Sequence, residues 1–383
     1  MRCSAVAGMG SIRPRALEVL TVALLTVSAA ASAALENTSD VIPRLNATRQ
    51  LVLPAGQGQH AVGIVVDLDE GGWEGPSSAA IDKHSRVLIA DGANGRVLVL
   101  GGNGQTTDVI TMPSGLEVRL VGFARDDEWM AAVGMDEDGS SWLVRLPLGW
   151  RVQHSADSPA RIALRGYIRG MASDRGGATY LVSDVGSVCL WRVAWNGSTP
   201  EQIEIRGLGL DGLKCWAVVR AADGHVYALV RGSGSLQLVR FDLQGRPEKQ
   251  WSLTRLLDVL ASSELMGIDK SMRMFLAEDI TADEPWDPPD RWGYLLRCYA
   301  ITDESATMVA AAEIRYGTGD MEGYPGCVAL GDGRPLSLAP DGAVVLRAAN
   351  SKQFKLKFYA PPPWRGNAPT VCSEAEVHLP GGS

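Results

Sequence analysis

The stretch Ser77–Leu100, SSAAIDKHSRVLIADGANGRVLVL, contains three short, mostly apolar runs separated by two polar segments. The runs are Ser77–Asp82, Arg86–Asp91 and Arg96–Leu100. Their Val and Ile residues favour β-strands, because branched side chains pack well on a pleated surface. The Asp-Gly-Ala-Asn-Gly segment before the third run supplies residues that adopt tight-turn backbone. This stretch therefore predicts three consecutive strands joined by short turns.

The same order of strands and turns recurs five more times along the chain. An aspartate marks the first turn of each unit: Asp82, Asp126, Asp174, Asp223, Asp269 and Asp341. The first five are 44 to 49 residues apart, and 72 residues separate the last two, where we expect insertions near Ile280–Arg291 and Gly317–Gly333. A period in the forties with three or four short strands is typical of a β-propeller blade. Two β-sandwiches would also give evenly spaced strands, but a single period with one order of turns favours the propeller.

We therefore predict an all-β, six-bladed β-propeller with four-stranded antiparallel blades. The expected organisation is a signal peptide at 1–33, an N-terminal extension at 34–60, the propeller at 61–360 and a C-terminal tail at 361–383. Three prolines beginning at Pro361 end the last blade one strand short, because proline cannot continue a ladder of hydrogen bonds. We expect Ala61–Asp67 to supply the missing outer strand, with the tail segment Cys372–Leu379 as the alternative.

Two of the units resemble a known repeat. Ser77–Leu100 resembles the NHL-type repeat of six-bladed propellers in the TolB-like superfamily, and Asp174–Val193 resembles it in part. The resemblance implies the propeller architecture and a binding role. The repeat carries no catalytic residue, so it implies no particular reaction.

The N-terminal residues have the pattern of a secretory signal. Basic residues that include Arg2 and Arg15 precede the mostly apolar stretch Ala16–Ala30, which ends in the small-x-small sequence of residues 31–33. We expect cleavage before Ala34 and a secreted or periplasmic protein, with an uncleaved anchor helix as the alternative. No second long apolar run follows, so we expect no integral membrane segment after removal of the signal.

Charge and cysteine content narrow the possible partners. The net charge of −8 becomes −10 once the three arginines and one glutamate of the signal are removed, which argues against nucleic acid and anionic membranes as partners. The cysteines beyond the signal show no C-x-x-C spacing, so a zinc site is not expected. We expect most of them to be buried on strands, and the sequence leaves a Cys327–Cys372 disulfide open.

Candidate binding residues lie on one face of the predicted propeller. Loops between second and third strands share that face with the connections between blades, and rigid scaffolds carry function on such loops. The predicted ligand-binding residues are Trp73, Asp91, Asp184, Arg231, Trp286 and Tyr324. Aromatic rings beside carboxylates suit sugars or cationic groups. The alternative is structural: tryptophans pack on neighbouring blades, and Asp91 and Asp184 bond their own turns.

The sequence favours an exported, non-catalytic binding or interaction propeller for an unidentified ligand, such as a carbohydrate or a peptide. We expect a monomer with no cofactor, no metal and no catalytic residues, because the five histidines show no ligand spacing and no G-x-S-x-G motif occurs. The alternative is a metal-dependent hydrolase or lactonase resembling the catalytic six-bladed propellers. That chemistry requires Glu, Asp and Asn oxygens converging on one cation at the channel mouth.

Overall fold

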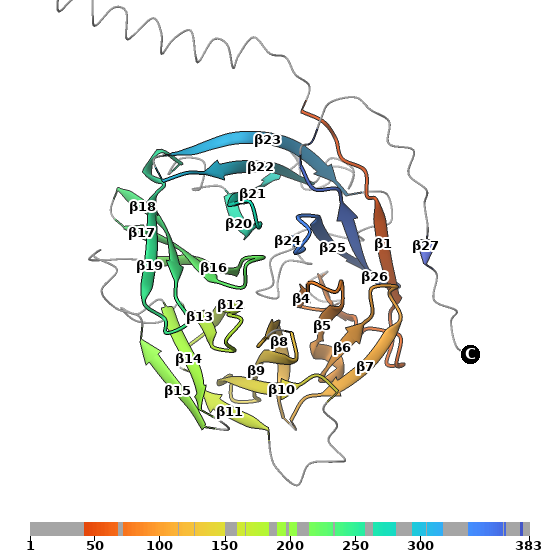
Figure 1. Cartoon of the computed structure of the whole chain (residues 1–383). Coiled ribbons are helices and arrows are strands. Elements are labelled where there is room, and N and C mark those ends of the chain that lie inside the picture. Colours follow the sequence, from red (N-terminus) through yellow and green to blue (C-terminus); the bar gives the residue numbers. More distant parts are fainter. Residues whose placement is uncertain are drawn as a thin grey trace, which may run out of the picture. The chain divides into compact units, whose positions relative to one another are not determined.

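The computed structural model describes most of the chain beyond residue 41. The described residues are 42–67, 72–113, 115–125, 127–149, 159–164, 166–183, 190–196, 199–204, 214–232, 234–256, 263–280, 293–303, 305–316, 336–362, 364 and 376–377. All of them except Ile42 belong to one compact unit, Pro43–Ser383. Within that unit six sheets are arranged around a common axis, as Figure 1 shows.

The first three blades follow the chain order. Blade 1 comprises β4 (Ser78–Ile81), β5 (Val87–Asp91), β6 (Arg96–Leu100) and β7 (Thr106–Thr111). Blade 2 comprises β8 (Glu117–Ala124), β9 (Trp129–Met135), β10 (Ser141–Pro147) and β11 (Ala160–Ala163). Blade 3 comprises β12 (Ile168–Ser173), β13 (Thr179–Ser183), β14 (Leu190–Asn196) and β15 (Thr199–Glu204).

The remaining blades complete the ring. Blade 4 comprises β16 (Lys214–Arg220), β17 (Val226–Gly232), β18 (Ser235–Phe241) and β19 (Pro247–Ser252). Blade 5 comprises β20 (Ser263–Ile268), β21 (Arg273–Ile280), β22 (Gly293–Ile301) and β23 (Ala306–Arg315). Blade 6 comprises β24 (Leu336–Leu338), β25 (Val344–Asn350), β26 (Gln353–Tyr359), β1 (Arg49–Pro54) and β27 (Glu376–Val377). The predicted six-bladed, mostly four-stranded antiparallel propeller is confirmed.

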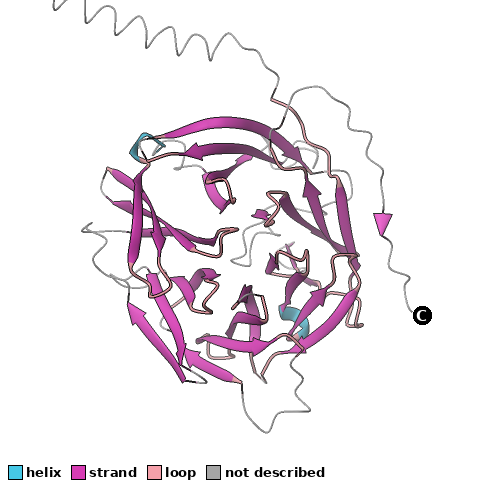
Figure 2. Ribbon diagram, in the orientation of Figure 1, coloured by secondary structure: helices cyan, strands magenta, loops and turns pink. Residues whose placement is uncertain are grey.

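The described part of the chain contains little other regular structure. A two-stranded hairpin pairs β2 (Val65–Asp67) with β3 (Gly72–Glu74), and short 3-10 helices lie at η1 (Gly92–Asn94) and η3 (Thr254–Leu256). Figure 2 shows the dominance of strands and connecting loops. In the ranges that the structure describes, no helix has the length and hydropathy required to span a bilayer.

The core lies between adjacent blades. The second strands are the most enclosed, since both of their faces pack against a neighbouring blade; β5, β13 and β25 are buried at every position. The outer strands are much less buried: β11 has no buried residue, and in β19 only Trp251 is buried. This gradient explains why the second-strand runs are the most continuously apolar in the sequence.

Ring closure is made by β1, which pairs antiparallel with β26 from Arg49–Phe358 to Pro54–Gln353. Leu51 and Leu53 are buried in a cluster that contains residues of blade 1 and blade 6. The expectation that Ala61–Asp67 closes the ring is wrong. The closing strand lies instead within 34–60, the segment expected to be an extension.

The segment Ala61–Asp67 has a different role. Ala61, Val62 and Gly63 are buried, but they are held by loop contacts beside blade 1 and not by a blade ladder. The apolar character of this segment therefore reflects burial under loops. The spacing of apolar residues in the sequence does not distinguish such burial from burial in a sheet. The alternative, in which the tail segment Cys372–Leu379 supplies the strand next to β26, is also wrong. The tail strand β27 lies parallel to β1 and does not pair with β26. Apart from Ile280, which ends β21, the two predicted insertions fall outside the described residues, as does the Cys327–Cys372 pair. Cys215 and Cys298 are buried.

The closure assignment predicts a large loss of stability for Leu53→Ala. Leu53 is 1% exposed, so truncation leaves a cavity, and we expect the free energy of unfolding to fall by about 2–5 kcal/mol. Urea denaturation followed by circular dichroism measures this change. Met308→Ala on the outer strand β23 is the control, because Met308 is 44% exposed and its truncation should cost about 0.5 kcal/mol or less. Equal effects of the two substitutions would contradict the assignment of β1 as a core strand.

Candidate functional site

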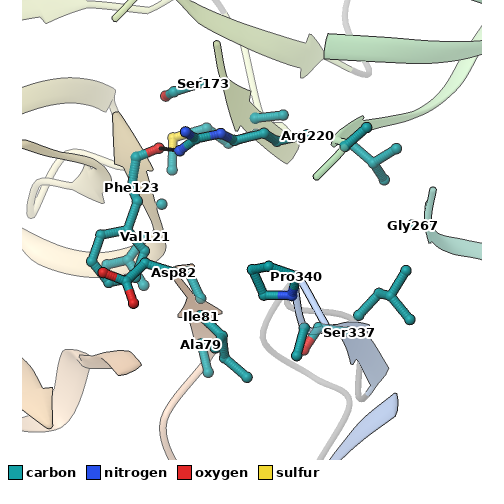
Figure 3. Close-up of a pocket in the computed structure, with 18 of the residues that line it drawn as sticks. Ala79, Ile81, Asp82, Val121, Phe123, Ser173, Arg220, Gly267, Ser337 and Pro340 are labelled. Carbon is teal, nitrogen blue, oxygen red and sulfur yellow. Dashed lines mark hydrogen bonds between the residues drawn. The ribbon is translucent and has the colours of Figure 1, made fainter. Parts of the chain in front are cut away.

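A cavity of about 260 Å³ occupies the centre of the ring. Residues from the first strand of every blade line it, together with the turns that follow some of these strands. A dry apolar cavity of about 150 Å³ is large enough to bind benzene, so this space can hold a somewhat larger organic molecule. Figure 3 shows the lining side chains, with Ile81, Phe123 and Pro340 among them.

The cavity exists because the first strands carry small residues at the axis. Ala79, Ala80, Gly122, Gly170, Ala172, Gly267 and Ser337 all line it. At Gly267 a side chain is excluded by packing, since a Cβ there would lie 2.8 Å from Cβ of Leu338 in the neighbouring blade. Apolar residues such as Ile81, Val121 and Met171 line the walls, together with polar residues such as Ser78 and Ser173. Such a wall favours the apolar body of a ligand.

The turns after the first strands surround one end of this cavity. In blade 1 the amide of Ser85 donates to the carbonyl of Asp82, and the Asp82 carboxylate accepts hydrogen bonds from the amides of His84 and Arg86. Asp174 and Asp269 occupy the same turn position in blades 3 and 5. In blades 4 and 6 that position is Ala221 and Ala339, so the predicted markers Asp223 and Asp341 lie two residues further on. Asp126, the marker predicted for blade 2, lies outside the described residues.

One ion pair crosses this end of the cavity. Arg220 is the last residue of β16 in blade 4, and its Nη1 donates to Oδ1 of Asp127 in blade 2 at 2.8 Å and to the carbonyl of Phe123 at 3.1 Å. Blade 3 lies between these blades in the ring, so the Arg220 side chain passes in front of it. Figure 3 shows the bond to Phe123 at the edge of the cavity. Asp127 is 3% exposed, with φ +67°, a strained conformation for a residue other than glycine.

Two further charged residues line the cavity. The Asp82 carboxylate is saturated, because it accepts two backbone amides and the Nε of Arg86 at 2.6 Å. Lys83, next in the chain, is exposed, and it forms no ion pair or hydrogen bond within the part of the chain that the structure describes. Lys83 is therefore a cation at the cavity whose charge no described partner neutralises.

Asp174, beside the cavity residue Ser173, is the least satisfied of the turn carboxylates. Its Oδ1 accepts the amide of Ala178 at 3.0 Å, but its buried Oδ2 has no hydrogen-bond partner among the described residues. Burial raises the pKa of the Asp174 carboxyl above its usual range, against the opposing effects of the Ala178 amide and the Arg192 charge. The native state therefore disfavours the ionised form of this group.

At the opposite end of the ring, arginine side chains form hydrogen bonds between neighbouring blades. Arg169 in blade 3 donates to the carbonyl of Cys215 in blade 4, and Arg347 in blade 6 donates to the carbonyl of Ser77 before blade 1. Burial lowers the pKa of Arg347 to about 10. These arginines hold the first strands together at the end where one blade connects to the next.

The ligand site predicted from the sequence belongs to that opposite end, and the structure describes only part of it. Asp184, Trp286 and Tyr324 lie outside the described residues, and Trp73 is described only as backbone in β3. Asp91 ends β5 in blade 1 and Arg231 is near the end of β17 in blade 4, so the two belong to blades that are not neighbours. This site stays a prediction.

Asp91 itself is engaged in a buried network. Its Oδ2 accepts Nδ2 of Asn94 and Nε of Arg96, both at 2.8 Å, and its Oδ1 accepts the amide of Gly63 at 2.7 Å. Arg96 also donates to three carbonyls within 57–61. These hydrogen bonds hold the segment after β1 against blade 1. The contact is close, because a Cβ at Gly63 would lie 2.6 Å from Cβ of Ala93. Asp91 thus has the structural role that the sequence left open beside the ligand role.

In the described ranges no three His, Cys, Asp or Glu side chains gather in a way that could hold a metal ion. The charged residues that line the central cavity, Asp82, Lys83, Asp127 and Arg220, were not among the predicted ligand-binding residues, and Asp82 was identified only as a turn marker. A signal for the cavity does exist in the sequence: small residues recur in the first run of the units, as in Ser77-Ser-Ala-Ala and Val121-Gly-Phe. No comparable signal identifies Arg220, because its partner Asp127 is 93 residues away in the chain.

Comparisons with known proteins identify no family for this chain. No family model and no curated protein matches the chain. The chain is similar to the structure of a streptogramin B lyase, with 12% identity over 81% of this chain and 98% of that one and a TM-score of 0.44. It is also similar to a virginiamycin B lyase from Staphylococcus aureus, with 9% identity over 81% of this chain and 99% of that one and a TM-score of 0.43. A protein of unknown function from Bacteroides thetaiotaomicron is similar with 16% identity over 81% of this chain and 76% of that one and a TM-score of 0.44. At these identities and TM-scores the likeness carries no argument about family or function, and the NHL-type assignment stays a prediction.

The Asp91 network predicts that Asp91→Asn destabilises the protein strongly. The substitution leaves the mostly buried Arg96 guanidinium without its carboxylate, and we expect a loss of about 3 kcal/mol or more in the free energy of unfolding. Asp138→Asn, in an exposed turn, serves as the control and should change stability by about 0.5 kcal/mol or less. Chemical denaturation measures both. A stable Asp91→Asn protein would leave Asp91 available for the ligand role.

The burial of Asp174 predicts a pH-dependent effect of Asp174→Asn. Because the native pKa is raised, ionisation of Asp174 at pH 7 costs native stability, and the neutral amide removes this cost. We expect the variant to be more stable than the wild type at pH 7. The difference should shrink as the pH falls through the raised pKa towards the unfolded value of about 3.9, where the carboxyl is protonated in both states.

Asp269→Asn is the matched control for this measurement, because Asp269 holds the same turn position but accepts bonds from Ser271, Arg273 and the Arg273 guanidinium. That variant should be less stable than the wild type at pH 7. Thermal denaturation at a series of pH values measures both differences. Destabilisation of Asp174→Asn at pH 7 would show that the Asp174 charge is compensated in the native state.

Proposed function

We propose that this chain is an exported, non-catalytic binding propeller that takes up a small, largely apolar ligand in its central cavity. The ligand enters at the end surrounded by the turns after the first strands. The observation that carries the proposal is the cavity itself, about 260 Å³ of space walled by first-strand residues of all six blades. Export rests on the signal-like pattern of residues 1–33, which lie outside the described residues.

The physical basis is the combination of apolar and polar side chains that line the cavity. Apolar side chains such as Ile81, Val121 and Met171 cannot form hydrogen bonds with water, so covering them with an apolar body is favourable. Polar side chains also line the cavity, namely Ser78, Asp82, Lys83, Asp127, Ser173, Arg220 and Ser337. Apolar side chains combined with oriented polar groups are the usual composition of small-molecule sites.

The test uses octan-1-ol as a neutral apolar probe and a variant that fills the cavity. Ser337 lines the cavity from β24, so the large ring of Ser337→Phe should occupy part of the space. We expect saturable binding of one octanol to the wild type, measured by titration with saturation-transfer NMR, and at least a tenfold weaker affinity in Ser337→Phe.

Ser252→Phe is the matched control, because it introduces the same ring at an exposed position of the outer strand β19. This variant should bind octanol like the wild type. Absence of saturable binding, or equal affinities of Ser337→Phe and the wild type, would mean that the cavity holds only water and would overturn the proposal.

A further inference from the structure

The charges around the central cavity do not balance. Four charged side chains line it: Asp82, Lys83, Asp127 and Arg220. Asp82 is neutralised by Arg86, whose Nε lies 2.6 Å from its Oδ2, and Asp127 is neutralised by Arg220. Lys83 remains, and the described residues offer it no counter-ion. One positive charge at the rim is therefore left for a ligand to neutralise.

Arg220 presents hydrogen-bond donors that its own contacts leave unused. Both of its protein acceptors, Oδ1 of Asp127 and the carbonyl of Phe123, are bonded by Nη1. The Nε and Nη2 atoms form the other edge of the planar guanidinium, and they have no acceptor among the described residues. That edge matches a carboxylate, which can accept two parallel hydrogen bonds from it.

The Arg220 guanidinium is also held in place before any ligand arrives. Its two bonds to blade 2 fix its position across the cavity end, and its side chain is 24% exposed although it lies among buried strands. A cation that is already oriented loses little conformational entropy when it binds an anion. Because the remaining donors are fixed at a partly exposed position in a cavity that apolar residues also line, they favour one charged headgroup attached to an apolar body.

Resting on the proposed function, we infer that the ligand of the cavity is a small amphiphilic monoanion whose carboxylate binds the Nε–Nη2 edge of Arg220 and the ammonium of Lys83. Its apolar part lies against Ile81, Val121 and Met171. Binding of one such anion neutralises the charge of Lys83, so the rim becomes neutral. The net charge of −8 opposes approach only weakly at physiological salt, where charges are screened over about 8 Å.

Octanoate and octan-1-ol test this inference, because they share an apolar chain and differ in the charge of the headgroup. We expect the wild type to bind octanoate at least tenfold more tightly than octanol at pH 7, measured by calorimetric titration. Lys83→Met should weaken octanoate several-fold and leave octanol unchanged, and raising the salt concentration should act in the same direction. Lys83 is exposed and makes no described bond, so this variant should fold normally.

Removing Arg220 alone would leave Asp127 as an unpaired buried charge, so the second variant is Arg220→Met combined with Asp127→Asn. We expect this double variant to bind octanol like the wild type and to lose the preference for octanoate. Thermal denaturation confirms that it is folded.

The outcomes separate the two proposals. Equal affinities of the wild type for octanoate and octanol would overturn the carboxylate inference and leave the proposed function in place. A preference for octanoate that persists in the folded double variant would place the anion elsewhere and also overturn the inference. Failure of both probes to bind would overturn the proposed function itself.

Discussion

Strand β1 is hydrogen-bonded to β26 along a register that runs from Arg49–Phe358 to Pro54–Gln353. Thr48, which precedes β1, donates a hydrogen bond from its hydroxyl to the carbonyl of Phe358, 310 residues further along the chain. A ring of sheets has an open edge wherever its ends fail to meet, and an open edge leaves unpaired backbone groups and uncovered apolar surface. The pairing of β1 removes this edge and places Leu51 and Leu53 in the core between the first and last blades. The arrangement of all first strands around one axis depends on this closure.

The turns around the cavity are also connected from blade to blade. Arg86 donates to the Asp127 carbonyl at 2.7 Å, and the amide of Arg175 donates to the Gly224 carbonyl. The Arg175 side chain packs over Gly224, where φ is +79° and a Cβ would lie 3.0 Å from the arginine Cβ. Glycine is required there both for its left-handed conformation and for the close contact. These contacts hold the cavity rim at a defined width.

Most carboxylates of this region serve the fold, and this decides the chemistry of the cavity. Asp82 and Asp269 each accept two backbone amides and an arginine Nε, so their oxygens are not available to a ligand. Asp127 is occupied in fixing Arg220. The groups that remain with unused donors are cationic, even though the chain as a whole is acidic. Net charge is therefore a poor guide to the preference of this particular site, because local pairing decides which charges face a ligand.

The order and spacing of the strands, the turns after the first strands and the number of blades were determined by the sequence, because each depends on residues close together in the chain. In Ser77–Leu100, runs rich in branched side chains and a Gly/Asn turn indicate three strands from residues that are close together in the chain. The closing strand was missed because Arg49–Pro54 and Ala61–Asp67 are both short apolar runs, and only the hydrogen bonds to β26 and to Asp91 distinguish them. The cavity and its cations were decided by the tertiary structure alone. Lys83, Asp127 and Arg220 come from three different blades, and their proximity follows from the closed ring and not from any local pattern.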